Sequence, residues 1–207
     1  MTSSTRLYLV RHGEPDQAAR GVCYGRTDVA LSPAGRRQAT ALGRWLGPTG
    51  PGVIYSSPRT RATETAAAIA SLASGPVVVV PALDEIDFGK VEGLSYDEIA
   101  ARRPGLYRRW MATPARVRFP GGETFADVRA RVVPWLADVR DKHEGGCVVA
   151  VTHGGPLRAA IASVLEMPDR AIFRLDAACG TATLVEWAGT TPIVRFHGHR
   201  PTTLASS

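Results

Sequence analysis

Two histidines in the sequence follow apolar, β-prone runs, and each is followed by glycine. His12 comes after LYLVR at 7–11, and His153 comes after CVVAVT at 147–152. A single histidine in such a place is more often structural, but two equivalent ones favour a shared active site. An imidazole with one unprotonated nitrogen can act as a nucleophile, so covalent catalysis through a histidine is the chemistry to consider.

The residues beside both histidines suit a phosphoryl group. Arg11 supplies a permanently charged, planar guanidinium that matches phosphate oxygens. Gly154 and Gly155 are expected to leave backbone amides accessible at the start of a helix, where the helix dipole favours negative charge. The sequence contains no P-loop pattern and no clustered Asp and His residues for a metal ion. These features predict metal-free transfer of a phosphoryl group through a histidine.

The periodicity of the sequence predicts strands that alternate with helices. The expected strands are residues 7–10, 52–57, 77–80, 147–152, 181–187 and 193–197. The expected helices are residues 33–46, 59–72, 97–103, 106–111, 124–142 and 155–165. This alternation predicts an α/β fold, a single three-layer α/β/α domain whose mostly parallel sheet carries helices on both faces. Ligands of such sheets bind beyond the carboxyl ends of the strands, where both histidines are expected.

Composition narrows the class of protein. The net charge is +6, but the arginines are scattered and form no basic block, so nucleic-acid binding is not expected. No apolar run approaches the roughly 20 residues that cross a bilayer, and no apolar segment of a signal peptide follows the N-terminus. Three separated cysteines without a CxxC pair favour a reduced, cytoplasmic setting. We expect one domain at 1–200 and a mobile tail at 201–207.

Four segments, in order, resemble the histidine phosphatase superfamily, also called phosphoglycerate mutase-like: LVRHGE, SSPRTRATETA, LDEIDFGKVEG and VVAVTHGG. The resemblance spans about residues 6–187 and implies the phosphoglycerate mutase-like fold and a phosphatase that needs no cofactor. It also implies that His12 is the nucleophile and forms a phosphohistidine that water then cleaves. Arg11 would bind phosphate oxygens, and His153 would stabilise charge on the transferring group.

The same resemblance selects two further residues. Its pattern of Ser, three residues and Arg-Ala selects Arg61, and Arg59 cannot face the same way because residues two apart lie on different faces of a helix. In LDEIDFG it selects Glu85 as the acid that protonates the leaving group. Ala18 stands where many relatives have an asparagine that helps hold phosphate. Arg26 is the candidate replacement, and a surface arginine is the alternative.

The segments CYGRTDVALS and FPGGETFADVRARV most resemble the α-ribazole phosphatase branch of small phosphatases. A small phosphorylated metabolite is therefore the expected partner, and segment 96–120 is expected to cover its pocket. The short stretch between Glu85 and His153 favours hydrolysis over the alternative, a phosphoglycerate mutase-type transfer. A phospho-ligand-binding module without activity is the other alternative, and the retained nucleophile and arginines argue against it.

Overall fold

A computed structural model describes residues 4–19 and 21–202, and its centre is a six-stranded sheet. The strands are β1 (Thr5–Arg11), β2 (Val53–Ser56), β3 (Val77–Val79), β4 (Cys147–Thr152), β5 (Ala182–Ala188) and β6 (Thr191–His199). Their order across the sheet is β3-β2-β4-β1-β5-β6. Strands β1 to β4 run parallel, whereas β5 is antiparallel to both β1 and β6. The mostly parallel sheet is confirmed.

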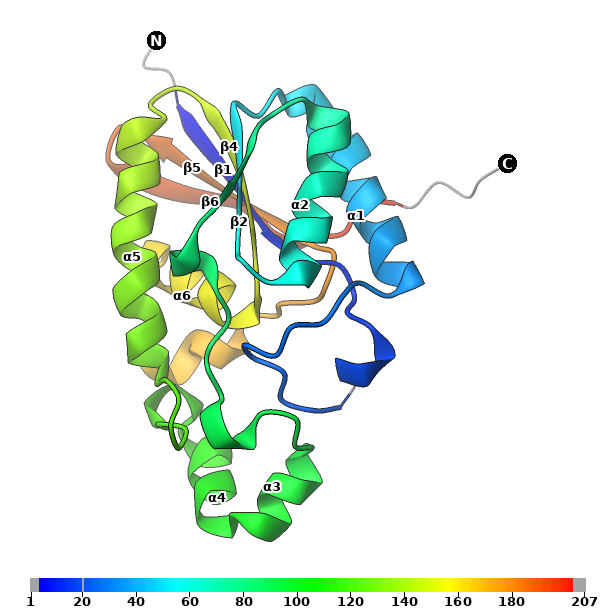
Figure 1. Cartoon of the computed structure of the whole chain (residues 1–207). Coiled ribbons are helices and arrows are strands. Elements are labelled where there is room, and N and C mark those ends of the chain that lie inside the picture. Colours follow the sequence, from blue (N-terminus) through cyan, green and yellow to red (C-terminus); the bar gives the residue numbers. More distant parts are fainter. Residues whose placement is uncertain (1–3, 20, 203–207) are drawn as a thin grey trace.

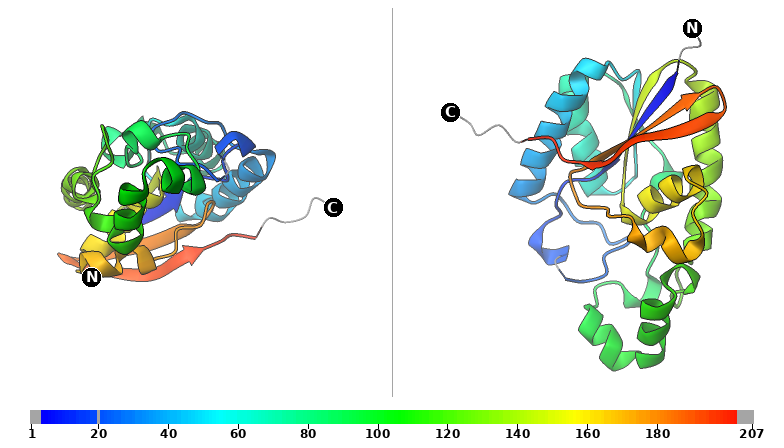
Figure 2. Two further views of the ribbon diagram at one scale, coloured as in Figure 1. Left: turned by 90° about the horizontal axis from the view of Figure 1, so that it is seen from below. Right: turned by 180° about the vertical axis from the view of Figure 1, so that it is seen from behind.

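Helices cover both faces of the sheet, as predicted (Figure 1). The α-helices of the chain are α1 (Pro33–Leu46), α2 (Thr60–Ala73), α3 (Tyr96–Arg102), α4 (Pro104–Ala112), α5 (Phe125–Lys142) and α6 (Gly154–Val164). Helices α1 and α2 pack together on one face, and α5 and α6 pack together on the other. Helices α3 and α4 stand beyond the carboxyl ends of the parallel strands, and the right-hand view of Figure 2 shows them apart from the sheet.

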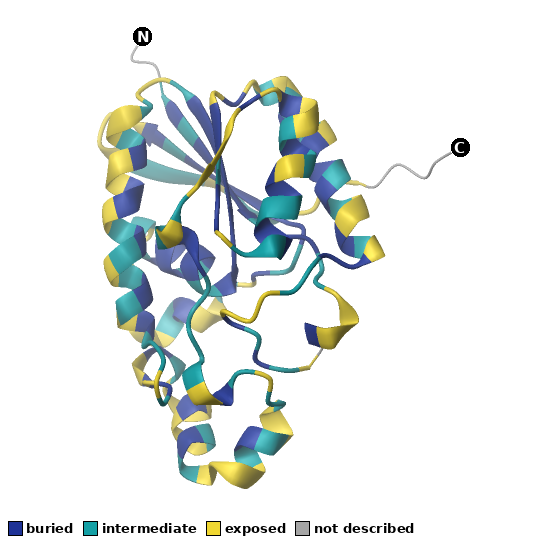
Figure 3. Cartoon of the chain, viewed as in Figure 1, coloured by how far each residue is buried: buried dark blue, intermediate teal, exposed yellow. Residues whose placement is uncertain are grey.

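The alternation of side chains along the central strand explains the three layers. Leu7 and Leu9 of β1 belong to the apolar core under α5 and α6. Tyr8 and Val10 point to the opposite face and belong to the core under α1 and α2. A strand that is covered on both faces needs apolar side chains on both of them, which is why residues 7–10 form a continuous apolar run. Figure 3 shows the resulting burial of the sheet between the helices.

Helix boundaries follow local signals in the sequence. The Ser32 side chain caps α1 by accepting a hydrogen bond from the chain within its first turn. Ser95 and Glu98 form a capping box at the start of α3, as their spacing predicts. Thr124 and Asp127 form a second capping box at the start of α5. The predicted helix ends differ from the observed ones by only a few residues.

Helices α3 and α4, together with the turns around them, form a third apolar cluster, here called the cap. Its buried members are Cys23, Val91, Ile99, Leu106, Trp110, Val117 and Phe119. No described helix is both long enough and apolar enough to span a bilayer. Of the tail expected to be mobile, residues 203–207 lie outside the described residues.

Candidate active site

The pairing of β1 with β4 brings the two histidines together. Arg11, the last residue of β1, lies opposite Thr152, the last residue of β4. The next residues are His12 and His153, and the His12 amide donates to the Thr152 carbonyl over 3.0 Å. Both histidines are completely buried, and their ring centroids are 5.0 Å apart. The structure therefore places the two histidines side by side at the carboxyl ends of two adjacent central strands, as the sequence predicts.

The protonation of His12 follows from its neighbours. Nδ1 lies 2.7 Å from the Gly13 carbonyl oxygen, which can only accept, so Nδ1 carries the hydrogen and Nε2 keeps its lone pair. Nε2 is buried and has no hydrogen-bond partner among the described residues. Burial, reinforced by the charges of Arg11 and Arg61, holds the pKa of His12 well below its usual value. The ring is thus neutral, with an unprotonated Nε2.

Helix α2 fixes the turn that carries this histidine. The Gly13 amide donates to Thr65 Oγ1 over 3.1 Å, and that hydroxyl donates to the Arg61 carbonyl over 2.7 Å. A Cβ on Gly13 would clash with the backbone of Gly35 in α1, so only glycine allows this approach. Sequence reasoning missed Thr65. Its position one helical turn after Arg61 is the signal that places it on the same face.

Arg61, rather than Arg59, enters the site. Its guanidinium is completely buried, and Nε donates to His153 Nδ1 over 3.3 Å. The terminal nitrogens donate to the carbonyls of Gly25 at 2.7 Å and Thr27 at 2.9 Å. Arg61 therefore also holds the loop between β1 and α1 against the site.

Arg59 binds a carboxylate at the edge of the site. Its Nε donates to Asp84 Oδ1 over 2.8 Å, and Nη1 donates to the Arg26 carbonyl over 2.8 Å. This position agrees with the peripheral role expected from the helical facing.

His153 has the opposite tautomer from His12. Its Nδ1 accepts from Arg61, so Nε2 carries the hydrogen and donates to Ser57 Oγ over 2.7 Å. Burial, followed by the nearby His12 and Arg61, lowers its pKa well below the usual value. Sequence reasoning gave Ser57 no role, although the residue stands in the SxxxRA pattern that selected Arg61.

Arg11 extends from the end of β1 toward the loops that surround the site. Nη1 donates to the Ala177 carbonyl, and Nη2 donates to the Tyr24 hydroxyl over 3.4 Å. Its Nε is buried and has no hydrogen-bond partner within residues 4–19 and 21–202. Tyr24, which sequence reasoning missed, also lies under Arg61, whose guanidinium carbon is 4.9 Å from the ring centroid.

Glu85 corrects one sequence-based expectation. The amides of Gly154 and Gly155 were expected to be accessible to an anion, but they donate to Glu85 Oε2 at 3.1 Å and Oε1 at 3.0 Å. The positive end of the α6 dipole favours this carboxylate as it would favour a phosphate. A Cβ on Gly155 would lie 2.5 Å from Glu85 Oε1, so glycine is needed there. The expected acid and the expected anion site are therefore in direct contact.

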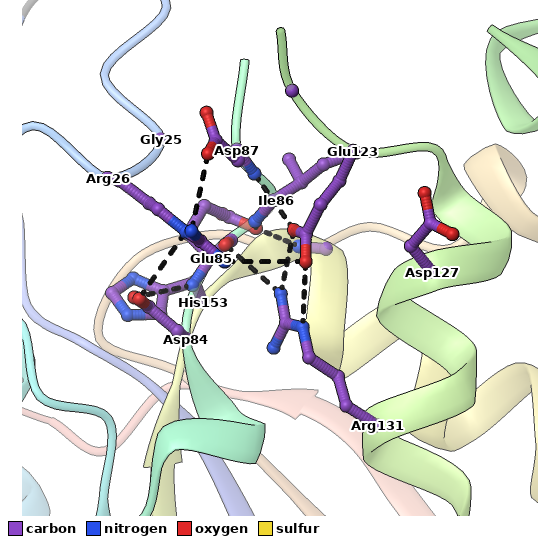
Figure 4. Close-up of polar contacts among 12 residues, drawn as sticks. Gly25, Arg26, Asp84, Glu85, Ile86, Asp87, Glu123, Asp127, Arg131 and His153 are labelled. Carbon is purple, nitrogen blue, oxygen red and sulfur yellow. Dashed lines mark hydrogen bonds and ion pairs between the residues drawn. The ribbon is translucent and has the colours of Figure 1, made fainter. Parts of the chain in front are cut away.

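An ion pair between α5 and the preceding turn supports the Glu85 segment (Figure 4). Arg131 donates to the carbonyls of Ala82 at 2.7 Å and Glu85 at 3.1 Å. The same guanidinium lies 3.2 Å from Glu123 Oε2, which also accepts from the Asp87 amide over 3.0 Å. These contacts tie both sides of Glu85 to helix α5.

The structure does not bring Arg26 to the residues that were expected to bind phosphate. Its guanidinium lies 3.8 Å from Asp84, 3.3 Å from Asp87 and 3.4 Å from Glu123 (Figure 4). Three carboxylates attract it away from the histidines, and 43% of its side chain stays exposed. Ala18, whose missing donor Arg26 was expected to replace, lies on an exposed turn.

A cavity of about 320 Å³ opens beside these residues. Its charged wall contains Arg11, Glu85 and Arg158, and Gly154 and Gly155 lie between them. The remaining wall is mostly aromatic and apolar: Val22, Cys23, Tyr24, Gly25, Ile86, Phe88, Tyr96, Trp110, Pro114, Phe119, Phe125 and Phe173. Several of these residues come from the cap, within the segment that was expected to cover the pocket.

Comparison with known proteins agrees with this geometry. A family model for the histidine phosphatase superfamily (branch 1) matches residues 7–199. The chain is 38% identical over 160 residues to phosphoserine phosphatase 1 of Hydrogenobacter thermophilus. The matched segment covers 77% of this chain and 76% of that relative.

Two solved structures have the same fold. One is a putative alpha-ribazole-5'-P phosphatase of Escherichia coli, with a TM-score of 0.86, 26% identity and coverage of 95% of this chain and 97% of the other. The second is mycobacterial glucosyl-3-phosphoglycerate phosphatase Rv2419c, with a TM-score of 0.86, 29% identity and coverage of 94% and 99%. The chain therefore belongs to the histidine phosphatase superfamily, which confirms the resemblance of its four motifs, and it is a phosphatase of that family.

Proposed function

We propose that this protein hydrolyses a small phosphate monoester through a phosphohistidine at His12. The observation that carries the proposal is the hydrogen bond from His12 Nδ1 to the Gly13 carbonyl. This bond leaves the Nε2 lone pair available within a site that contains Arg11 and Arg61. A neutral imidazole beside fixed cations is suited to attack a phosphoryl group.

In the proposed complex, the two arginines bind the phosphoryl oxygens. Arg61 uses one N–H of each terminal nitrogen to hold backbone carbonyls, and the second N–H of each can donate to phosphate. Arg11 offers its buried Nε–H. The Gly154 amide and His153 Nε2–H supply further donors when phosphate replaces their present acceptors, Glu85 and Ser57. Phosphoryl transfer depends chiefly on this positioning and charge stabilisation.

The reaction then proceeds in two steps. The lone pair of His12 Nε2 attacks phosphorus, and the bond from phosphorus to the ester oxygen breaks. Glu85, which phosphate displaces from the Gly154 amide and which then takes up a proton from solvent, transfers that proton to the ester oxygen. Nδ1–H stays bonded to the Gly13 carbonyl, which stabilises the positive charge on the ring. In the second step Glu85, now a carboxylate, takes a proton from water as the water attacks phosphorus. The phosphorus–nitrogen bond breaks, and phosphate and free His12 result.

The cysteines and the cavity support a cellular location and a class of substrate. The three cysteines, Cys23, Cys147 and Cys179, are all free thiols, which supports a reduced, cytoplasmic location. A cavity of about 320 Å³ has the size of a site for a small molecule. A small phosphorylated metabolite is thus the proposed substrate.

The first test measures hydrolysis of p-nitrophenyl phosphate in excess chelator, with wild type beside His12→Ala. Wild type should remain active, and His12→Ala should lose at least about 1000-fold in kcat/KM because the covalent route is removed. Wild type quenched during turnover at alkaline pH should carry phosphate on the peptide that contains His12, as read by mass spectrometry. His199→Ala, which changes an exposed histidine, is the matched control. Full activity in folded His12→Ala would contradict the proposal.

A further inference from the structure

Arg158 is a cation of the cavity wall that the reaction above does not use. It lies on α6, one turn after Gly154, and lines the same cavity as Arg11. A Cβ on Gly154 would lie 3.1 Å from Arg158 Nη1 and 3.6 Å from Arg11 Nη1, so the two guanidinium groups flank this glycine. Burial, followed by the charge of Arg11, lowers the pKa of Arg158. An anion bound here would therefore offset the free-energy cost of burying the charged guanidinium of Arg158.

The contacts of Arg158 orient its guanidinium without neutralising it. Nε donates to the Leu175 carbonyl over 3.0 Å, and Nη1 lies 3.4 Å from the Gly154 carbonyl. The guanidinium carbon lies 5.5 Å from the centroid of the Phe173 ring. Backbone carbonyls and an aromatic ring hold the group in place but carry no full negative charge. Glu85 and Asp176 act on it through their charge, but neither forms an ion pair with it among the described residues, so a fixed cation faces the cavity.

The position of Arg158 relates it to the leaving group. In the proposed reaction the phosphoryl group lies at His12 and is bound by Arg11 and Arg61. Arg158 is instead next to Phe173, which packs on Phe125 with ring centroids 5.6 Å apart. It thus stands where the phosphate-binding end meets the aromatic wall. A phosphorylated molecule that fills the cavity would bring its non-phosphate part to this point.

The charged side chains of the cavity wall limit which charged groups the non-phosphate part of the substrate can have. Among the described residues that line the cavity, Glu85 is the only acidic side chain, and the proposed reaction uses it to move a proton. A leaving group with an ammonium would find no second carboxylate there. A leaving group with a carboxylate would find the guanidinium of Arg158, which can form charge-assisted hydrogen bonds.

Resting on the proposed function, we propose that Arg158 binds a carboxylate of the leaving group. The substrate is then the phosphate ester of a hydroxy acid that has no ammonium group and whose apolar body packs on the aromatic wall. Arg158 is thereby a specificity-determining residue.

Two near-isosteric substrates test the proposal: 3-carboxyphenyl phosphate and 3-carbamoylphenyl phosphate. Wild type should prefer the carboxylate in kcat/KM by about 10- to 100-fold, the usual effect of a hydrogen bond to a charged group. Arg158→Met should abolish the preference by lowering kcat/KM for the carboxylate substrate far more than for the carbamoyl substrate, whereas Arg158→Lys should keep part of the preference. Arg174→Met removes a nearby exposed arginine outside the cavity wall and is the control for general charge effects.

Two kinetic outcomes would overturn the assignment. Equal losses on both substrates would mean that Arg158 contacts the phosphoryl group, and no loss on either would mean that it binds neither part. Turnover that survives His12→Ala would instead contradict the proposed function. Calorimetric binding of the two substrates to His12→Ala, with and without Arg158→Met, measures the preference without turnover. Equal affinities for the two substrates would overturn it there as well.

Discussion

His12 and Arg61 have no exposed surface, whereas Tyr96 and Phe173, in the wall of the adjoining cavity, keep 47% and 44% of theirs exposed. The first pair is positioned by β1 and α2, which belong to the sheet and its covering layer. The second pair lies on α3 and on the turn Asp169–Arg174. The end of the site that contains the two histidines is therefore built into the core, and the end proposed to meet the leaving group is built on the surface.

Because of this difference, we expect residues near the sheet to determine catalysis and residues of the cap to determine substrate selectivity. The cap has an apolar cluster of its own, which includes Val91, Ile99 and Trp110. Glu92 joins it to the loop near the histidines by accepting from the amides of Arg26 at 2.7 Å and Thr27 at 2.8 Å. Substitutions in the cap should thus change substrate binding, and substitutions near the sheet should change catalysis or folding.

The largest expected contrast concerns Glu85. Glu85→Gln keeps the size of the side chain but cannot transfer a proton, so kcat/KM for alkyl phosphates should fall about 100- to 1000-fold. For p-nitrophenyl phosphate the loss should stay below about tenfold, because its leaving group departs without a proton. Asp97→Asn, at an exposed acid on α3, is the control. Equal losses on both substrates would remove the role of proton donor.

The next contrast is in stability against pH. His12 and His153 have pKa values held well below the usual one, so both stay neutral when folded, whereas the unfolded chain takes up protons below about pH 6.5. The unfolding free energy should therefore fall as the pH falls, by up to about 1.4 kcal/mol per pH unit for each histidine.

Urea unfolding of wild type and His12→Asn between about pH 7 and pH 5 measures this dependence. The variant should lose less stability per pH unit than wild type, and His199→Asn, at an exposed histidine, is the control. A pH slope that is the same in His12→Asn and wild type would contradict the neutral, buried state of this histidine.

The smallest expected effect is in the cap. Tyr96 stacks on Trp110 with a centroid distance of 5.0 Å and an interplanar angle of 16°. Tyr96→Ala should raise KM for aryl phosphates about fivefold, the usual worth of an aromatic contact, and leave kcat unchanged. Met111→Ala on α4, half exposed and outside the cavity wall, is the control. A fall in kcat as large as the rise in KM would show that the cap also positions reacting groups.

Much of the reacting end could be predicted from the sequence because its signals are local. Apolar runs predicted β1 and β4, and the glycines after His12 and His153 marked the strand ends. Helical facing and the motif together separated Arg61 from Arg59. Each of these inferences depends on residues that are neighbours in the chain.

The failures involve residues that are distant in the chain. Nothing beside Arg26 in the sequence shows that Asp84, Asp87 and Glu123 converge on its guanidinium. The amides at the start of α6 were expected to be accessible to an anion, but they bind Glu85, which comes from another loop. Arg158 reads from sequence as one more residue of an apolar helix, because only the folded chain shows what it faces.

The 5.0 Å between the two histidine rings is close to the spacing of about 4.8 Å between neighbouring strands in any sheet. The distance between the two imidazole rings is thus set by backbone hydrogen bonds between β1 and β4, which do not depend on side-chain identity. The cap has no such constraint. Substitutions in the cap can therefore alter the aromatic wall of the cavity without changing the distance between the two histidines.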